Sequence, residues 1–310
     1  MTGLGSPRDF SLETFSSRIA AEGIGFDIGP FRTHIHTTEP SLFEPLHRLY
    51  ADFPLVDPHN VFALHASLTS IRTRPWLRRS RVRFTVDGFA PHEDMPVDQA
   101  LPVLEWGINL VIAMRSHHLL MLHSAVLEKD GRAVVLPGTP GSGKSTLCAT
   151  MAHHGWRLLS DEFGLVPHGS ADFVPVPRPI ALKNEAIDVF RSFAPGAVLG
   201  PRIPNTRKGT VAHVRPPADS VQRQMERAPA RLVVFPRWQA GAALEWTELP
   251  KPQSFMALAT NAFNYDLLGE EGFRTVKSII DSCSAYRLVY SDLNEAMSWL
   301  DELAAGVGDE

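Results

Sequence analysis

The chain has 310 residues, with 30 Lys and Arg against 34 Asp and Glu and a formal net charge of −4. A hydrophobic share of 44% and a charged share of 21% are ordinary for a globular protein and exclude disorder as the dominant state. This charge balance gives no reason to expect a nucleic acid or an anionic membrane as partner. Two cysteines, Cys148 and Cys283, cannot cross-link a fold of this size, so we expect a reduced, cytoplasmic protein.

The N-terminal residues Met1 to Asp9 lack the basic flank and apolar run of a secretory signal. The most apolar stretch, residues 108–126, is interrupted by Arg115, His117 and His118. No segment reaches the roughly 18–20 consecutive apolar residues that a membrane-spanning helix needs. We therefore expect a soluble protein.

The first third of the chain is rich in short strand-like runs, such as residues 31–36 and 82–86, punctuated by proline and glycine. One helix is expected over residues 41–50. These patterns predict a small N-terminal α+β domain over residues 1–95. A proline-containing polar stretch, residues 91–96, marks its boundary with a second domain over residues 96–310.

The second domain alternates helices and strands. Its first half is expected to contain an amphipathic helix over 98–118, strands over 119–128 and 132–136, a helix over 144–154 and a strand over 156–159. An Asp-Gly pair at 130–131, between two apolar runs, predicts a tight hairpin. Proline-rich loops are expected over 167–180 and 195–217, then a strand over 232–236, helices over 252–262 and 270–283, a strand over 285–290 and a helix over 293–304.

A glycine-rich loop follows the predicted strand 132–136 and precedes a predicted helix, and it satisfies the pattern G-x-x-x-x-G-K-[ST]. Its residues are Gly138, Thr139, Pro140, Gly141, Ser142, Gly143, Lys144, Ser145 and Thr146. Glycines let backbone N–H groups curl around phosphate oxygens, and the helix N-terminus adds partial positive charge. Lys144 is expected to reach the β- and γ-phosphates and Ser145 to bind Mg²⁺. The loop predicts nucleotide binding, with ATP as the expected nucleotide.

Two adjacent carboxylates, Asp161 and Glu162, follow the next predicted strand. Open α/β sheets place ligands at the carboxyl ends of their strands, so one acid could hold the metal and the other could act as general base. The alternative is a solvated turn.

His123 lies in the apolar run 119–127, where a lone histidine is either a packed core residue or part of the site. His117 and His118 are expected at a helix end. The remaining histidines have no zinc-site spacing, so no zinc centre is expected.

The stretch from His123-Ser-Ala-Val-Leu through the glycine loop to Leu158-Leu-Ser-Asp-Glu162 resembles the catalytic core of the HPr kinase/phosphorylase family. The intervals also match: fifteen residues from His123 to Gly138, and seventeen from Lys144 to Asp161. The whole chain looks like the HprK-related kinase A subgroup, in residues 104–107, 177–184, 208–215 and 261–265. This resemblance implies an α/β fold: a P-loop kinase core of the HPr kinase type, with a mixed, strongly β sheet and flanking helices, plus the small N-terminal α+β domain.

The resemblance also implies roles for three residues. Asp161 matches the aspartate that handles the proton together with a histidine, which His123 matches, and Glu162 stands where the family has a second aspartate. The family's loop for capturing its protein partner has no clear counterpart, so the acceptor need not be the HPr phosphocarrier protein. The implied activity is transfer of the γ-phosphoryl group of ATP, with Mg²⁺, to a Ser- or Thr-like hydroxyl of a peptide or protein.

Further positive charge near the transferring group is expected from basic residues in the later segments. The candidates are Arg178, Lys183, Arg207, Lys208 and Arg215, each of which could instead be a surface cation. Asn264 and Tyr265 could be an inward polar pair or part of the acceptor site, and Trp106 is expected in the core. A small-molecule kinase, a phosphorylase or phosphatase, and a nucleotide-binding regulator stay open, as does a homo-oligomer.

Overall fold

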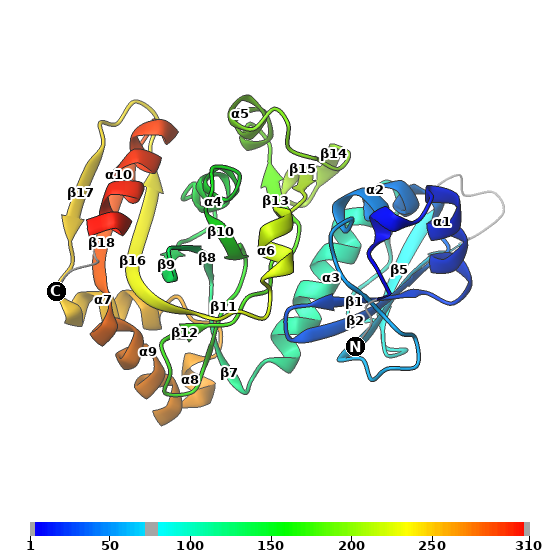
Figure 1. Ribbon diagram of the computed structural model, residues 1–310, viewed down its shortest axis with the longest axis horizontal. Coiled ribbons are helices and arrows are strands. Elements are labelled where there is room, and N and C mark those ends of the chain that lie inside the picture. Colours follow the sequence, from blue (N-terminus) through cyan, green and yellow to red (C-terminus); the bar gives the residue numbers. More distant parts are fainter. Residues whose placement is uncertain (1–3, 72–79, 307–310) are drawn as a thin grey trace. The chain divides into compact units, whose positions relative to one another are not determined.

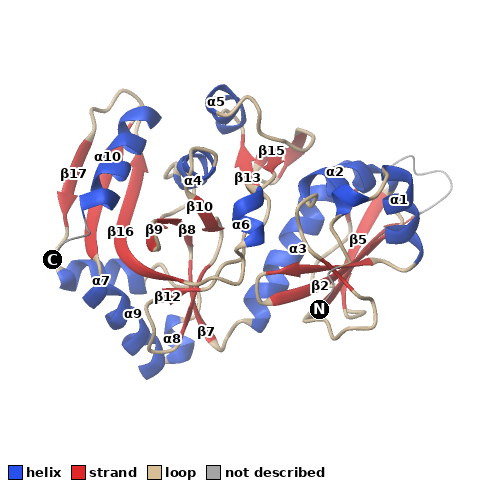
Figure 2. Ribbon diagram, viewed as in Figure 1, coloured by secondary structure: helices blue, strands red, loops and turns tan. Residues whose placement is uncertain are grey.

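The computed structural model describes residues 4–71 and 80–306, which form a mixed α/β protein with several sheets and helices α1–α10 (Figures 1 and 2). The described residues divide into two compact units. The first comprises the chain up to Met114 together with Pro179–Arg191 and Pro195–Gln222. The second comprises Arg115–Arg178, Ser192–Ala194 and the chain from Arg223 onward. This partition differs from the expected domains 1–95 and 96–310, since it groups the helix before residue 115 and most of 179–222 with the N-terminal residues.

The first unit contains a six-stranded sheet. Its strands, in spatial order, are β3 (Leu55–Val56), β1 (Ile24–Ile28), β2 (Phe31–Thr37), β4 (Leu64–Ile71), β5 (Arg81–Val86) and β6 (Met95–Pro96). Its helices are α1 (Leu12–Ala21), α2 (Phe43–Leu49) and α3 (Ala100–Arg115). The expected strands 31–36 and 82–86 and the expected helix 41–50 are confirmed. The alternating burial along β2 and β5 is that of strands with one face on a core.

The first unit also contains a three-stranded sheet, two of whose strands, β14 (Ile203–Thr206) and β15 (Gly209–Val214), lie in the segment 195–217 that the sequence predicted as a loop. In spatial order its strands are β13 (Ile180–Lys183), β15 and β14, accompanied by α5 (Ala186–Phe193) and α6 (Ala218–Gln222). The expectation of loops throughout 195–217 is wrong, because cross-strand pairing stabilises short strands whose local signal proline and glycine obscure.

The second unit is built on a mixed sheet of seven strands. In spatial order they are β10 (Arg157–Ser160), β8 (Ser124–Lys129), β9 (Arg132–Pro137), β16 (Ala228–Trp238), β18 (Ser284–Tyr290) and β17 (Glu245–Glu248), with β12 (Asp172–Phe173) also paired to β16. β9, β16 and β18 run parallel, whereas β8 is antiparallel to both β9 and β10. β9 and β10 therefore point the same way, and their carboxyl ends share one edge of the sheet.

Helices cover this sheet. One group is α7 (Lys251–Ala259), α8 (Tyr265–Leu268) and α9 (Glu270–Ser282), and the others are α4 (Lys144–Ala152) and α10 (Leu293–Gly306). A buried cluster joins Val135 of β9 and Val233 of β16 to Val276, Ile279 and Ile280 of α9. In chain order Val134 and Leu136, also buried, alternate with Val135, so they belong to the opposite face of β9. Burial of both faces explains the continuous apolar run of this strand.

The hairpin between β8 and β9 forms as predicted. Lys129 pairs with Arg132, and the two turn residues, Asp130 and Gly131, have φ values of 51° and 78°. Two consecutive positive φ angles are the signature of a type I′ turn, which Asp-Gly favours.

The expected single strand over 119–128 is instead two strands. β7 (Leu119–Leu122) pairs with β11 (Gly164–Pro167), whereas β8 joins the main sheet, and His123 lies between them. The backbone bends at His123, whose N–H donates to Asn261 O and whose carbonyl oxygen accepts from Gly138 N. The continuous apolar run concealed this break because both strands are buried.

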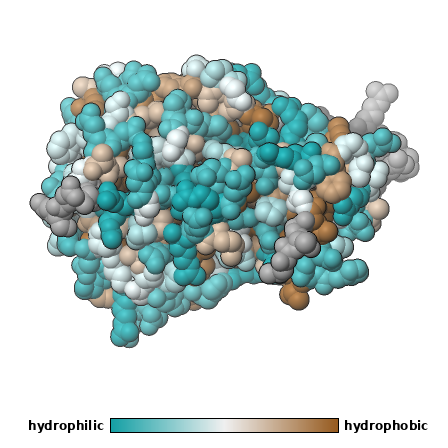
Figure 3. Space-filling view, viewed as in Figure 1, coloured by the Kyte–Doolittle hydropathy of each residue, from teal (hydrophilic) through white to brown (hydrophobic). Residues whose placement is uncertain are grey.

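Among the described residues, one helical segment, Val97–Arg115, is long and apolar enough by length and composition to cross a membrane. Of its most apolar window, 61% is buried inside the protein, as in a core helix. In the face of the molecule that Figure 3 draws, hydrophilic residues cover most of the surface, with smaller hydrophobic groups between them.

Candidate functional site

The candidate site lies within the second unit, at the edge of the sheet where β9 and β10 end. The glycine loop follows β9, Asp161 and Glu162 follow β10, and His123 precedes β8. Ser124 pairs with Pro137 and Val126 with Ser160, so β8 aligns the ends of its two neighbours. Antiparallel pairing thereby brings three segments from different parts of the chain to one edge. The sequence-predicted loop, acids and histidine are brought together there.

The loop has the backbone that its glycines were expected to provide. Gly141 and Gly143 adopt φ values of 89° and 87°, a left-handed region that favours glycine. A Cβ at Gly143 would lie 2.5 Å from Tyr290 Oη and 2.8 Å from Trp238 Cβ, so this position also needs a small residue for space. Ser142 N donates to Thr139 O at 3.2 Å, which closes the loop into a turn.

Helix α4 begins at Lys144, directly after the loop, and points its amino end at this edge. The first N–H groups of a helix have no partner within the helix, so they are available to an anion. Lys144 is buried and Ser145 half-buried, while Thr139, Pro140 and Gly141 are exposed. The first half of the loop, residues 139–141, is therefore open to solvent, whereas the Lys144 side chain is buried.

The carboxylate of Asp161 lies close to α4. Burial raises the pKa of the Cys148 thiol well above its ordinary value, and the charge of Asp161 and a hydrogen bond to it raise the pKa further, while the charge of Lys144 lowers it. Cys148 is one turn beyond Lys144 on α4. The charges of the predicted phosphate-binding lysine and of the predicted base therefore both affect the pKa of the Cys148 thiol.

Turn geometry positions the two acids differently. Phe163 N donates to Ser160 Oγ at 3.1 Å, and this hydrogen bond shapes the turn that carries both carboxylates. Asp161 is buried, whereas Glu162 is half-buried. One acid of the pair is therefore enclosed and the other is accessible to solvent.

His123 is half-buried and packs against an aromatic pair. Its ring centroid lies 5.3 Å from that of Phe263, which lies 5.4 Å from that of Phe163. Phe263 is 55% exposed, so the aromatic pair beside His123 is partly open to solvent. Neither phenylalanine was predicted as a site residue, because their positions depend on the pairing of β7 with β11 and on the Phe263 N to Met121 O hydrogen bond.

The basic candidates divide between the two units. Arg178 is buried in the second unit, two residues beyond Val176, whose N–H donates to Leu159 O next to the acidic turn. Lys183, Arg207, Lys208 and Arg215 all belong to the first unit. Arg178 is therefore the basic candidate that the fold of the second unit brings near the acids.

Two of the first-unit cations have partners within that unit. Lys208 Nζ lies 5.1 Å from the ring centroid of Trp106, which is half-buried rather than in the core. Arg215 Nε lies 3.5 Å from Asp52 Oδ2, and burial lowers the pKa of its guanidinium.

Asn264 has a structural role. Its Oδ1 accepts from Met121 N at 3.0 Å and its Nδ2 donates to Leu119 O at 2.8 Å, so the buried amide holds β7. Tyr265 packs 6.4 Å from Phe255, measured between ring centroids. Of the two readings for this pair, the structure supports inward packing.

Two residues beside the loop were missed by sequence reasoning. Trp238 N donates to Ser142 O at 2.9 Å, and Tyr290 Oη donates to Gly143 O at 3.3 Å. They end the parallel strands β16 and β18, where they pair in register. The available signal was the buried strand 232–236, since a strand parallel to β9 carries its last residues to the same edge.

Part of the chain is similar to a known family. The family of SynChlorMet cassette protein ScmC matches residues 93–184, which is under one third of the chain. The matched segment includes the glycine loop, His123, both acids and Arg178. A search of curated proteins found no match.

Proposed function

We propose that the protein is an ATP-dependent, Mg²⁺-requiring kinase with a P-loop core of the HPr kinase type, which phosphorylates a Ser- or Thr-like hydroxyl of a peptide or protein. The observation that carries the proposal is that the glycine loop, with its buried Lys144, and the buried Asp161 lie at the same edge of one sheet. The peptide or protein acceptor rests on the family resemblance.

The loop residues fit a triphosphate. A Cβ at Gly138 would lie 2.5 Å from Ser142 Oγ, so the glycine allows the loop to close tightly. The hydroxyl of Ser142, within the loop, is buried and has no hydrogen-bond partner among the described residues. Such groups cost free energy unless a ligand or water satisfies them. A glycine cradle, a helix amino end and a lysine are the groups that bind phosphate oxygens.

The residues also fit Mg²⁺, which prefers hard oxygen ligands. Ser145 and Glu162 are the residues that would hold it, through a hydroxyl and a carboxylate that are both half-buried. When bound, the ion neutralises charge on the β- and γ-phosphate oxygens.

Asp161 is proposed to accept the proton of the acceptor hydroxyl. The acceptor oxygen forms a bond to the γ-phosphorus while the bond from that phosphorus to the β–γ bridging oxygen breaks, and ADP leaves. The hydroxyl proton passes to the Asp161 carboxylate, and His123 is proposed to orient that carboxylate. Lys144 and the buried Arg178 supply positive charge to the transferring group.

The test is incubation of the protein with γ-labelled ATP and a cell lysate, followed by mass spectrometry of the labelled species. Label transfer to a hydroxyl of a peptide or protein, lost in Lys144→Ala, supports the proposal. If the label appears on small molecules instead, the acceptor is a small molecule rather than a peptide or protein. ATP binding without any label transfer would overturn the kinase assignment.

A further inference from the structure

A large aromatic side chain stands exposed beside the phosphate-binding loop. Trp238 ends β16, and 47% of its surface is exposed although its backbone is fixed to the loop through Ser142 O. Its indole is fixed as well, because Nε1 donates to Ser291 O at 3.2 Å. Singly exposed aromatic residues are common on protein surfaces, but this indole is held in place directly beside the glycine loop.

The position of Trp238 within the sheet separates it from the predicted proton acceptor. The strand order is β10, β8, β9, β16, β18, with the loop after β9 near the middle. Asp161 follows β10, on one side of β9, and Trp238 ends β16, on the other side. The two residues therefore flank the loop from opposite directions along the edge.

The geometry of phosphoryl transfer relates the side from which the acceptor approaches to the side toward which the nucleoside diphosphate leaves. The attacking and leaving oxygens lie roughly in line, on opposite sides of the γ-phosphorus. An acceptor whose proton passes to Asp161 approaches from the β10 side, so the departing nucleoside diphosphate extends toward β16 and β18. The nucleoside end of the triphosphate is thus directed to the side where Trp238 stands.

We propose that Trp238 is the stacking platform for the nucleobase of a purine nucleoside triphosphate bound at the loop. This inference rests on the proposed function and adds its base subsite. The single polar group of the indole is already hydrogen-bonded to Ser291 O, so a ligand would meet only its π-surface. A flat π-surface recognises a base by stacking, and a purine presents the larger face. Since the ring is fixed before binding, stacking costs little side-chain entropy.

The indole can be removed without removing the contact between β16 and the loop. That contact is made by the backbone N–H of Trp238, which an alanine at this position retains. Trp246 of β17 offers a matched control, because it is 54% exposed in the same sheet and packs 6.0 Å from both Tyr286 and Trp299, measured between ring centroids.

The experiment compares two ligands that differ only in the nucleoside. Binding of ATP and of inorganic tripolyphosphate, each with Mg²⁺, is measured by calorimetry on the wild type, Trp238→Ala, Trp238→Phe and Trp246→Ala. We expect Trp238→Ala to weaken ATP binding by about 5- to 100-fold, the usual worth of one stacked base. Tripolyphosphate binding is expected to stay within about twofold, because it lacks the base. Trp238→Phe should keep most of the ATP affinity, and Trp246→Ala should match the wild type.

The outcomes separate this inference from the proposed function. If the wild type binds both ligands and Trp238→Ala leaves ATP affinity unchanged, or weakens both ligands equally, the stacking role is wrong while the phosphate site stands. If the wild type binds neither ligand, the proposed function fails and the base subsite fails with it. Circular dichroism of Trp238→Ala confirms that the comparison is made on folded protein.

Discussion

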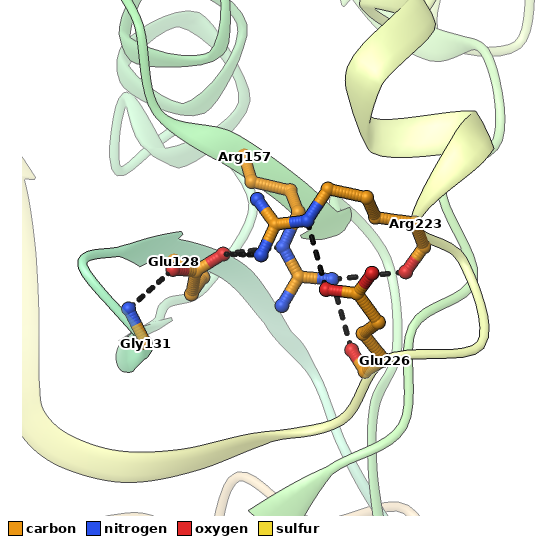
Figure 4. Close-up of polar contacts among 5 residues, drawn as sticks. All are labelled: Glu128, Gly131, Arg157, Arg223 and Glu226. Atoms are coloured by element: carbon orange, nitrogen blue, oxygen red, sulfur yellow. Dashed lines mark hydrogen bonds and ion pairs between the residues drawn. The ribbon is translucent and has the colours of Figure 1, made fainter.

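Strands β8 and β10 carry charged groups at both ends, and the two ends are built in opposite ways. At one end, Glu128 and Arg157 face each other across the strands with side chains only 3% exposed (Figure 4). Arg157 donates to Glu128 and to the carbonyls of Arg223 and Glu226, and Gly131 N donates to Glu128 at 2.6 Å. Every charge there has protein partners. At the other end, Asp161 lies beside a glycine loop with an exposed first half.

If the proposed function is right, the two ends of this sheet divide stability from ligand binding. At the end with Glu128, the charged side chains of Glu128 and Arg157 are paired with groups of the protein itself. The end with Asp161 holds a buried lysine, the amino end of α4 and the buried hydroxyl of Ser142, which has no hydrogen-bond partner among the described residues. A triphosphate bound as proposed would supply a partner for that hydroxyl. Substitutions at the first end should change stability alone, and substitutions at the second should change binding or transfer.

The largest effect is expected for the proposed base. Asp161→Asn should lower the rate of phosphoryl transfer by about 10²–10⁴-fold, the usual worth of a general base, while ATP affinity stays within about threefold. Single-turnover transfer and equilibrium ATP binding measure the two quantities. Glu128→Gln is the control at the opposite end and should leave the transfer rate of folded protein unchanged. Transfer at the wild-type rate by Asp161→Asn would exclude this role.

The largest stability effect is expected at the other end. Glu128→Ala leaves the buried Arg157 guanidinium without its carboxylate, and breaking such a pair costs about 3–5 kcal/mol. Urea unfolding measures the free energy. A loss below about 1 kcal/mol would show that the cluster does not act as a buried ion pair.

Two glycines, one before β9 and one after it, differ in their surroundings. Gly131 and Gly143 both have positive φ, but a Cβ at Gly131 would meet nothing within 4 Å, whereas at Gly143 it would meet Tyr290 and Trp238. Gly131→Ala should cost about 1–2 kcal/mol of stability and leave ATP affinity unchanged. Gly143→Ala should displace the loop and lower ATP affinity by more than about tenfold. Equal ATP affinity in the two variants would contradict the proposed role of the glycine loop in ATP binding.

The ionisation of Glu128 predicts a pH dependence of stability. Burial by itself raises the pKa of this carboxyl, but hydrogen bonds from Arg157 and Gly131 and the charges of Arg157 and Arg223 outweigh it, so the pKa lies below its usual value. The carboxylate therefore adds stability above the unfolded-state pKa of about 4.3, and that stability is lost as pH falls through the folded-state pKa.

We expect the free energy of unfolding of the wild type to decrease from about pH 5 to about pH 3, and that of Glu128→Gln to decrease less steeply. Urea titrations at several pH values compare the two slopes. Identical slopes would mean that Glu128 does not titrate differently in the folded and unfolded chains.

The smallest effect is expected for an exposed pair in the same unit. Arg274 Nη2 and Glu270 Oε1 lie 2.5 Å apart on α9, with side chains 60% and 74% exposed. Glu270→Ala should cost less than about 1 kcal/mol, because solvent screens the pair. A loss as large as that of Glu128→Ala would show that burial does not decide the strength of these pairs.

Local patterns predicted the parts of this site that are contiguous in sequence. The Asp130-Gly131 hairpin, the glycine loop and the start of α4 at Lys144 each depend on a few neighbouring residues with distinctive backbone requirements. The parts brought by long-range pairing had no such signal. His123 was assigned to a continuous strand because apolar residues flank it on both sides, and Trp238 and Tyr290 reach the loop only through the parallel pairing of β9, β16 and β18.

In the proposed function, the shared carboxyl edge of β9 and β10 binds ATP through the glycine loop. Calorimetric titration of ATP with Mg²⁺ into the wild type and Lys144→Ala tests it without knowledge of the acceptor. We expect saturable one-to-one binding by the wild type and at least about a tenfold loss of affinity in a folded Lys144→Ala variant, since the ammonium makes charge-assisted contacts to the phosphates. Equal affinities, or no binding by the wild type, would contradict the claim.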